Sequence, residues 1–196
     1  MQLVQLENGN MFNAKTIENF ILKEDTEYLV NLANSTDLWE IIENSFWNNR
    51  TIDFNKILKH DKNAAVIMLD AKIRCGQKIK EFYDLEEVYA DSLHLIRWFP
   101  GMEQPPHADD MSNTEVKGLE HRAFGSIIYL NNNYFGGHTY YPNFDVEITP
   151  KPGMLAIHPG DVEHLHGVTK IEGAMRYTIA SFWTLDKGKS HEWSIY

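Results

Sequence analysis

The strand pattern is clearest in residues 154–183, which read MLAIHPGDVEHLHGVTKIEGAMRYTIASFW. A short, mostly apolar run that contains Ile157 lies at the start of this stretch, at Met154–His158, and a run rich in Ile, Tyr, Phe, Trp and Thr lies at its end, at Arg176–Trp183. Residues of these types fit the pleated surface of a β-sheet. Pro159-Gly160-Asp161 is a turn signal directly after the first run. The stretch therefore predicts two β-strands.

The same texture extends back to about residue 88. It predicts further strands at Ser92–Trp98, Gly125–Leu130, His138–Tyr141 and Phe144–Ile148. Turn signals recur at intervals of roughly eight to twelve residues, which favours a sandwich or jelly roll over alternating strands and helices. Side chains such as Ile127, Ile157 and Ile179 are expected to line the interior of this barrel.

Residues 1–90 have a different periodicity. Apolar residues recur there at intervals of three and four, as in Leu29, Leu32, Ala33, Val66, Leu69 and Ile73. This spacing predicts amphipathic helices, and Asp25 or Thr26 is the expected N-cap of the first. We therefore predict an α+β protein with a mainly β core. A single domain of residues 1–196 would contain supporting helices over about 1–90, a barrel over about 91–185 and a short tail over 186–196.

Composition narrows the possible functions. The 18 Lys and Arg against 28 Asp and Glu give a net charge of −10, which repels phosphate backbones and disfavours a nucleic-acid partner. The single cysteine, Cys75, cannot form an internal disulfide and is expected to be buried. The N-terminal residues MQLVQLENGNMF lack the pattern of a signal peptide, and no apolar run is long enough to cross a membrane. We expect a cytoplasmic protein with no membrane partner.

His107 and Asp109 are the first candidate metal ligands. They lie two residues apart in a segment that follows Pro105-Pro106 and is expected to be extended. Side chains at i and i+2 of such a segment point to the same face, so an imidazole and a carboxylate can converge there. A pair of this kind is also common in solvent-exposed loops. It indicates a metal site only if a third ligand comes from elsewhere.

The candidates for that third ligand are His164 and His166, which share one face, so their spacing alone does not choose between them. Two histidines and one carboxylate on one face of an octahedron are typical of non-haem Fe(II) oxygenases. Zinc with the same residues and a water is the competing interpretation. A pair of surface histidines beside a turn is the third.

Arg176 is the candidate for anion binding. Alternation in the last predicted strand places Arg176, Thr178, Ala180 and Phe182 on one face. An arginine that points into a barrel needs an anion, because a buried unpaired guanidinium costs several kcal/mol, on the order of 3–5. Its planar fork suits a carboxylate, so it could hold the far end of a dicarboxylate that chelates the metal. The alternative is an internal salt bridge to Asp or Glu.

The order of these features resembles a known family. His107-x-Asp109 is followed by Tyr129-Leu130-Asn131, Gly136-Gly137-x-Thr139, His166, and Arg176 at the start of an aromatic-rich strand. This order is similar to that of the Fe(II)/2-oxoglutarate-dependent dioxygenase superfamily, prolyl 4-hydroxylase type, over about residues 92–184. The resemblance implies a double-stranded β-helix (jelly roll) with the helices packed on its outside.

The resemblance also implies roles for individual residues. His107, Asp109 and His166 would bind Fe(II), and Arg176 would pair with the C5 carboxylate of 2-oxoglutarate. His166 is favoured over His164 because Arg176 follows it by ten positions, as the basic residue does in the family. Tyr129 and Thr139 match positions that donate hydrogen bonds to the same carboxylate in different branches of the family. The alternatives are a core tyrosine and a threonine that simply favours a strand. Arg122 falls where related hydroxylases place an arginine on the substrate side.

The implied activity is hydroxylation of a substrate C–H bond, with dioxygen consumed and succinate and CO2 released. A peptidyl proline is the implied target, so the partner would be a proline-containing peptide or protein, and ascorbate is a further implied cofactor. The oligomeric state is not specified. The polar segment Asp110–Glu120 is interpreted either as a mobile loop over the site or as a plain solvent loop.

Three departures from the family are visible: Trp98 concerns the contact with the C1 end of 2-oxoglutarate, whereas Arg176 and His138 concern the substrate. Trp98 stands nine residues before His107 where the collagen-type enzymes have Tyr, Arg176 replaces their Lys, and His138 stands where Glu is common. The same chemistry on a free amino acid, another small substrate or an alkylated base therefore stays open, although the acidic charge disfavours the base. A non-catalytic metal-binding jelly-roll module and a zinc hydrolase are two further interpretations of the same residues. No role is assigned to five further histidines, which are His60, His94, His121, His158 and His191.

Overall fold

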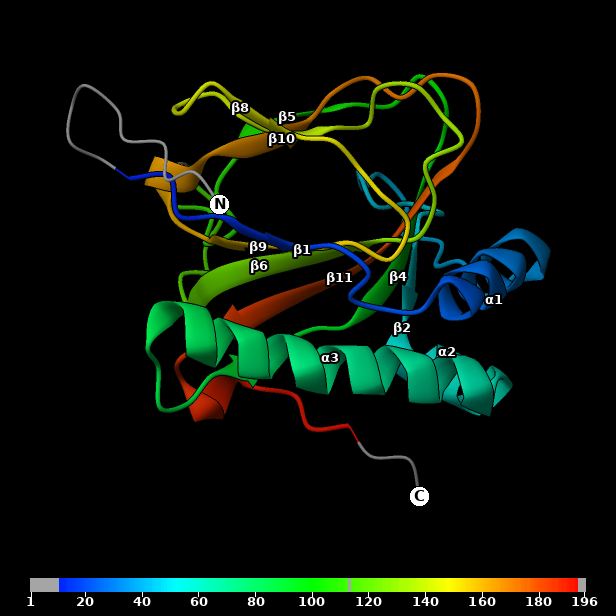
Figure 1. Ribbon diagram of the computed structural model, residues 1–196, viewed down its shortest axis with the longest axis horizontal. Coiled ribbons are helices and arrows are strands. Elements are labelled where there is room, and N and C mark those ends of the chain that lie inside the picture. The colour runs from blue at the N-terminus through cyan, green and yellow to red at the C-terminus, as the bar shows by residue number, and fades with distance from the viewer. Residues whose placement is uncertain (1–10, 113, 194–196) are drawn as a thin grey trace.

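The computed structural model describes residues 11–112 and 114–193. Two antiparallel β-sheets face each other, and the helices cover the outer face of the larger one (Figure 1). The predicted α+β class with a mainly β core is confirmed. Asn113 in the expected loop, residues 1–10 of the expected helical part and residues 194–196 of the expected tail lie outside the described residues.

The larger sheet has seven strands in the order β1-β9-β6-β11-β4-β2, and β3 pairs with the end of β11. The bounds of its strands are β1 Lys15–Ile17, β2 Thr51–Asp53, β3 Tyr89–Ala90, β4 His94–Trp98, β6 Arg122–Tyr129, β9 Leu155–Pro159 and β11 Arg176–Thr184. The expectation that residues 1–90 are mainly helical is therefore only partly right. β1 and β2 are three-residue strands, too short to show alternation, and pairing with long neighbours holds them in the sheet.

The smaller sheet has four strands in the order β5-β10-β7-β8. Their bounds are β5 Gln104–His107, β7 Thr139–Tyr141, β8 Val146–Ile148 and β10 His166–Val168. β5 contains Pro105-Pro106, and a proline has no N–H to donate to a ladder. The pairing of β5 with β10 is accordingly irregular, with a register shift between His166 and Val168.

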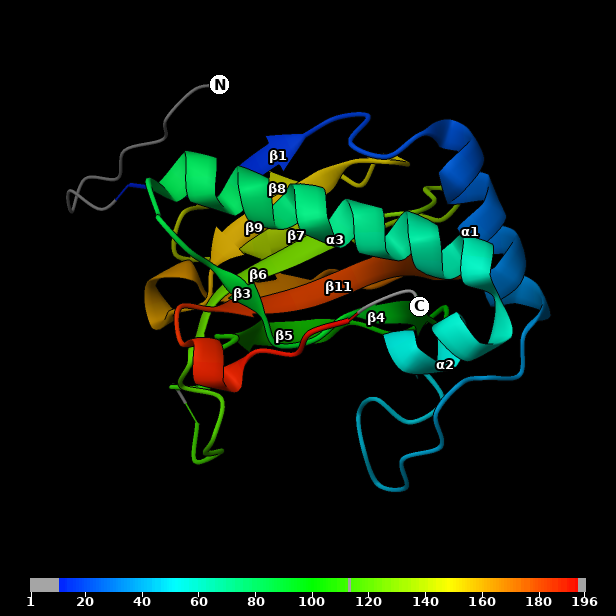
Figure 2. The same ribbon diagram turned by 90° about the horizontal axis from the view of Figure 1, so that it is seen from below.

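Three α-helices support the larger sheet: α1 Lys23–Ser35, α2 Phe54–His60 and α3 Lys62–Tyr83. Figure 2 shows α3 crossing the outer face of this sheet. Asp53 caps α2 and Asp61 caps α3, each accepting a hydrogen bond from a backbone N–H of the first turn. The predicted N-cap of α1 at Asp25 or Thr26 is wrong, because the helix already begins at Lys23 after Leu22. Two short 3-10 turns, Val162–His164 and Lys187–Lys189, complete the described elements.

The buried face of α3 differs from the predicted one. Val66 and Ile73 are each 51% exposed. Half of the buried residues of this helix are alanines; the buried set is Ala64, Ala65, Met68, Ala71, Cys75 and Ile79. Small side chains let the helix approach the sheet closely, and the ring of Trp183 would lie only 3.0 Å from a Cβ at Gly76. The predicted burial of Cys75 is confirmed.

The larger sheet separates two apolar regions. Tyr177, Ile179, Trp183 and Ile157 belong to the cluster that contains the helices' buried residues. The expectation that Ile157 and Ile179 line the space between the sheets is therefore wrong, whereas Ile127 packs with the cluster between the sheets. Period-two alternation determines which residues share a face, but both faces of this sheet are covered, so it does not determine which face is which.

Among the described residues, no helix is both long enough and apolar enough to cross a lipid bilayer.

Candidate functional site

His107 and His166 lie next to each other on two neighbouring strands of the smaller sheet. The two residues are direct partners in the β5–β10 register, so their side chains lie on the same face. Their ring centroids are 4.5 Å apart. The irregular pairing at Pro105-Pro106 ends at this position. A local departure from regular pairing thus lies directly beside the two imidazoles.

Asp109 completes the group. Its Oδ1 lies 3.8 Å from Nε2 of His107 and 3.6 Å from Nε2 of His166. One ligand atom from each of the three residues lies within 4.8 Å of the others. A single ion could contact two imidazole nitrogens and one carboxylate oxygen in this arrangement, which is the donor set of a facial triad.

The hydrogen bonds of both imidazoles favour an unprotonated Nε2, and Nε2 of His107 also lies 3.3 Å from Nε2 of Gln104. Nδ1 of His107 lies 3.2 Å from the carbonyl oxygen of Pro105, and Nδ1 of His166 lies 3.2 Å from that of His164. A carbonyl only accepts, so each ring carries its proton on Nδ1 and leaves Nε2 as an acceptor. Backbone carbonyls commonly orient metal-binding histidines in this way. These tautomers fit a metal ion at the shared point.

The pKa shifts of Asp109 and His166 also suit a bound cation. Burial raises the pKa of the Asp109 carboxyl, although His158, His107 and Arg122 each lower it. Burial, with help from His158 and His107, holds the pKa of His166 well below its usual range. His166 is therefore neutral near pH 7, the form that binds metals, and a cation would stabilise the ionised carboxylate of Asp109.

The structure separates the two candidate histidines. His164 donates from Nδ1 to Oδ1 of Asp161 at 2.8 Å, and its ring packs on Phe144. It is not part of the group formed by His107, Asp109 and His166. The turn at Asp161, which also accepts a hydrogen bond from the backbone N–H of His164, directs this side chain away.

Sequence reasoning missed His158. This residue at the end of β9 is 1% exposed, and its ring centroid lies 4.1 Å from that of His166. Its Nδ1 is 3.8 Å from Oδ2 of Asp109. The signal available in the sequence was its place in the predicted strand Met154–His158, but no ligand spacing connects it to His107 or Asp109.

Arg176 is buried at the start of β11. Its Cζ lies 5.2 Å from the ring centroid of Trp98 and 5.3 Å from that of Tyr129. Within the part of the chain that the structure describes, no acidic side chain pairs with Arg176, and its Nε and Nη2 are buried without a hydrogen-bond partner. The internal salt bridge weighed from the sequence is therefore absent there, and the guanidinium is available to an anion.

Hydroxyl groups surround this guanidinium. The hydroxyls of Tyr129 and Thr139 are 2.7 Å apart, and both residues are fully buried. Burial raises the pKa of Tyr129 although Arg176 lowers it, so the phenol stays a hydrogen-bond donor. A Cβ at Gly137 would lie 3.0 Å from Cδ of Arg176, so glycine leaves room for the arginine stem. The structure thus brings Arg176, Tyr129 and Thr139 together.

A second buried guanidinium lies beside Trp98. Cζ of Arg50 is 4.0 Å from the Trp98 ring centroid and 4.1 Å from that of Phe46. Its Nη1 donates to the carbonyl of Phe46 at 2.9 Å. Burial and the positive charge of Arg176 lower the pKa of Arg50 to about 10. No pattern in the sequence indicates that Arg50 and Arg176 share one aromatic ring.

Arg122 forms an ion pair with Asp91. Its Nε donates to Oδ2 of Asp91 at 2.9 Å, and Nε2 of His121 lies 2.9 Å from the same oxygen. The guanidinium also packs on the ring of Phe182 at 3.7 Å. The expected loop begins at Asp110, whose backbone N–H donates to the carbonyl of Gly160. A substrate-side role for Arg122 stays a prediction, and so does a role for the loop as a cover over the site.

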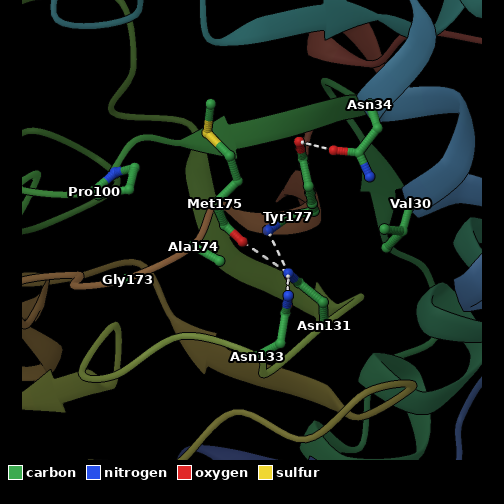
Figure 3. Close-up of a pocket in the computed structure, with 9 residues that line it drawn as sticks. All are labelled: Val30, Asn34, Pro100, Asn131, Asn133, Gly173, Ala174, Met175 and Tyr177. Atoms are coloured by element: carbon green, nitrogen blue, oxygen red, sulfur yellow. Dashed lines mark hydrogen bonds between the residues drawn. The ribbon is translucent and has the colours of Figure 1, made fainter.

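A cavity of about 360 Å³ lies on the other face of β11 (Figure 3). Successive residues of a strand point to opposite faces, so Tyr177 lines this cavity while Arg176 points between the sheets. Its polar groups bond one another: Tyr177 donates to Asn34 at 2.7 Å, and Asn131 donates to the carbonyl of Met175 at 2.7 Å. The cavity is therefore separate from the group around Asp109.

Comparisons with known proteins agree with this geometry. The chain is 26% identical over 145 residues to a putative prolyl 4-hydroxylase of Acanthamoeba polyphaga mimivirus, a match that covers 67% of the chain and 59% of that relative. The chain thus spans less than two thirds of this relative's length.

Two solved structures have a similar fold. A viral collagen prolyl hydroxylase from Paramecium Bursaria Chlorella virus-1, in a 2OG complex, has a TM-score of 0.58 at 18% identity, over 92% of this chain and 98% of that one. A prolyl hydroxylase from Trichoplax adhaerens, in complex with a hypoxia inducible factor peptide fragment, has a TM-score of 0.60 at 17% identity, over 90% and 85% of the two chains. At these identities the likeness concerns the fold.

The family is given by the sequence of the β core. Residues 93–184 match the 2OG-Fe(II) oxygenase superfamily, and they contain β4 to β11 together with His107, Asp109, His166 and Arg176. The family predicted from the order of these residues is confirmed. Over residues 93–184 the chain is similar to the 2OG-Fe(II) oxygenase superfamily, and over 145 residues it is similar to a putative prolyl 4-hydroxylase.

Proposed function

We propose that the protein is an Fe(II)- and 2-oxoglutarate-dependent dioxygenase that hydroxylates a substrate C–H bond. The observation that carries the proposal is the pairing of two groups in one interior. His107, Asp109 and His166 converge on one point, and Arg176 lies buried without an acidic partner in the described part of the chain. The two groups match the two ends of a chelating dicarboxylate.

His107, Asp109 and His166 would hold Fe(II). When bound, the metal supplies activation of dioxygen and oxidation of 2-oxoglutarate to succinate and CO2. The protein orients both imidazoles through the carbonyls of Pro105 and His164. The finer fold we propose is the double-stranded β-helix, with the two facing sheets as its walls.

Arg176 would bind the C5 carboxylate of 2-oxoglutarate. Its planar fork can donate two parallel hydrogen bonds to a carboxylate. The hydroxyls of Tyr129 and Thr139 share one hydrogen bond, so the one that accepts in this pair can donate a third bond to the carboxylate. Trp98 forms an apolar wall beside the guanidinium. The low polarity of this environment strengthens each of these contacts.

The substrate we propose is a peptidyl proline, in a peptide or protein partner, with ascorbate as a supporting reductant. Support comes from the mimivirus relative and from the peptide bound to the Trichoplax adhaerens enzyme. The same oxygenase acting on a free amino acid or another small molecule, and a non-catalytic metal-binding module, are the alternative outcomes of the test.

The test starts with anaerobic addition of Fe(II) and 2-oxoglutarate and a search for the visible charge-transfer band. Air and a proline-rich peptide library follow, with succinate and peptide mass as the measurements. We expect succinate and a gain of one oxygen on proline. Succinate without a modified peptide would point to another substrate. Metal binding without any decarboxylation would contradict the proposed enzyme and favour the binding module.

A further inference from the structure

The carboxylate of Asp109 lies between the two sheets and touches both. Oδ1 faces the imidazoles of His107 and His166 on the smaller sheet. Oδ2 occupies the place that a side chain at Gly125 on β6 would take, since a Cβ there would lie 2.2 Å from it. A side chain at this position would therefore displace the carboxylate.

His158 lies directly opposite Gly125 in the β6–β9 register. The same Cβ would lie 2.5 Å from Cε1 and 2.8 Å from Nε2 of His158. The glycine thus makes room for both the carboxylate and the imidazole. Cross-strand partners share a face of a sheet, which explains why His158 points at Asp109 although the two residues lie far apart in the sequence.

The orientation of the His158 ring is fixed on two sides. Its Nδ1 donates to the carbonyl oxygen of Pro159 at 3.0 Å, and its ring packs on His166 with centroids 4.1 Å apart. The ring of Tyr141 lies 5.8 Å from each of these imidazoles. A residue held in this way can in turn restrict its neighbours.

The second carboxylate oxygen of Asp109, Oδ2, lies beside the His158 ring. It is buried without a hydrogen-bond partner among the residues that the structure describes, and Nδ1 of His158 lies 3.8 Å from it. A buried carboxylate oxygen is stabilised by a polar group beside it and not by an apolar one. The polar edge of His158 is the group in that place.

We propose that His158 is a positioning residue for the metal ligand Asp109. Together with the space left by Gly125, it holds Oδ2 away from the proposed metal point, so that Oδ1 alone faces the ion. Binding through one oxygen leaves positions of the metal free for the co-substrate and dioxygen. This inference rests on the proposed ligand set and adds a residue outside it.

The test uses Mn(II) as the probe and calorimetry as the readout, without substrate. We expect His158→Ala and His158→Phe to bind Mn(II) about ten-fold or more weakly, the loss typical for residues that orient a metal ligand. His158→Asn places an amide nitrogen near the position of Nδ1 and should retain most of the affinity. His60→Ala removes an exposed histidine and serves as the matched control.

Gly125→Ala tests the space that the glycine leaves for the carboxylate. It should weaken Mn(II) binding at least as strongly as the His158 variants, because the added Cβ would clash with Oδ2 of Asp109. Thermal melts of every variant separate loss of fold from loss of the site. If the His158 variants do not fold, Gly125→Ala decides alone. The Fe(II)/2-oxoglutarate charge-transfer band provides a second readout, and we expect its maximum to shift in His158→Phe.

Wild-type affinity in His158→Phe or Gly125→Ala, or equal losses in His158→Asn and His158→Phe, would overturn the inference. A wild-type protein that does not bind Mn(II) at all would instead contradict the proposed ligand set. The two failures are therefore distinguishable in the same titration.

Discussion

At one end of the space between the sheets, the Asp109 carboxylate lies 4% exposed beside imidazoles and has no basic partner closer than these rings in the described chain. At the other end, Arg176 and Arg50 lie buried beside Trp98, and no acidic side chain in residues 11–112 and 114–193 pairs with Arg176. Asp109 and Arg176 carry opposite charges in one interior and yet do not pair. Each end is left with a charge that a ligand can neutralise.

Strand β6 shows why the two charges stay apart. Gly125 touches Asp109, whereas Tyr129 lies next to Arg176, and these positions differ by four residues. Four residues of a strand correspond to about 13 Å. A salt bridge cannot form over this distance, so the fold holds one anion and one cation at a separation that a chelating dicarboxylate and its metal ion can fill.

The largest effect is expected at the metal end. His107→Ala, Asp109→Ala or His166→Ala removes one of three ligands and should abolish both Mn(II) binding and iron-dependent succinate formation. His164→Ala is the control, because His164 is paired with Asp161 outside the group. Full turnover in a ligand variant would refute that ligand, and equal loss in His164→Ala would show that the measurement reports stability.

Arg176→Met should affect only the other end. We expect the affinity for 2-oxoglutarate to fall about 100-fold, because a charge-assisted bidentate contact contributes on the order of 3 kcal/mol. The affinity for Mn(II) should stay unchanged. A 2-oxo acid without the second carboxylate should bind the variant and the wild type equally well in a competition titration. If Mn(II) binding also falls, the two ends are coupled and do not act independently.

Asp109→Asn should have the smallest effect and is measured on the metal-free protein. Burial raises the pKa of Asp109 in the folded state. The stability contributed by this carboxyl is therefore present below its unfolded pKa and lost as the pH rises through the folded value. The amide is neutral at every pH and avoids this loss. At pH 8 the melting temperature of the variant should therefore rise by about 2–4 °C for each kcal/mol of destabilisation that the ionised carboxylate causes in the wild type.

This difference in stability should shrink as the pH falls, because protonation of the wild-type carboxyl removes the buried charge. Burial lowers the pKa of His158 and His166, but both residues are present in the two proteins, so the comparison isolates Asp109. Mn(II) should stabilise the wild type and leave Asp109→Asn unchanged. A variant less stable than the wild type at pH 8 would show that the carboxylate is already neutralised within the chain.

The strands of the β core could be predicted because their residues are β-branched or aromatic and turn residues separate them. The sequence also placed His107, Asp109 and His166 in a family order, and the structure brings these residues together. The helix faces were less predictable. Val66 and Ile73 fit an apolar stripe, but the sheet accepts the flatter alanine face of α3 instead.

The residues that support the site left no pattern in the sequence. His158 lies beside Asp109 because it is the cross-strand partner of Gly125. Arg50 lies over the ring of Trp98 because it directly precedes the edge strand β2. Contacts of this kind join segments that are distant in the chain, and no local spacing reports them. A glycine inside a strand pattern was the one available signal, since it marks a close approach.

By itself, the sequence determined the mainly β class, the alternation of each long strand and the residue types able to bind a metal and a carboxylate, because these follow from local propensity and period. The tertiary structure placed His166, and not His164, beside His107 and Asp109, left Arg176 without an acidic partner among the described residues, and set His158 beside Asp109. These outcomes depend on register and on distances between sheets, which form only when the strands pair and pack.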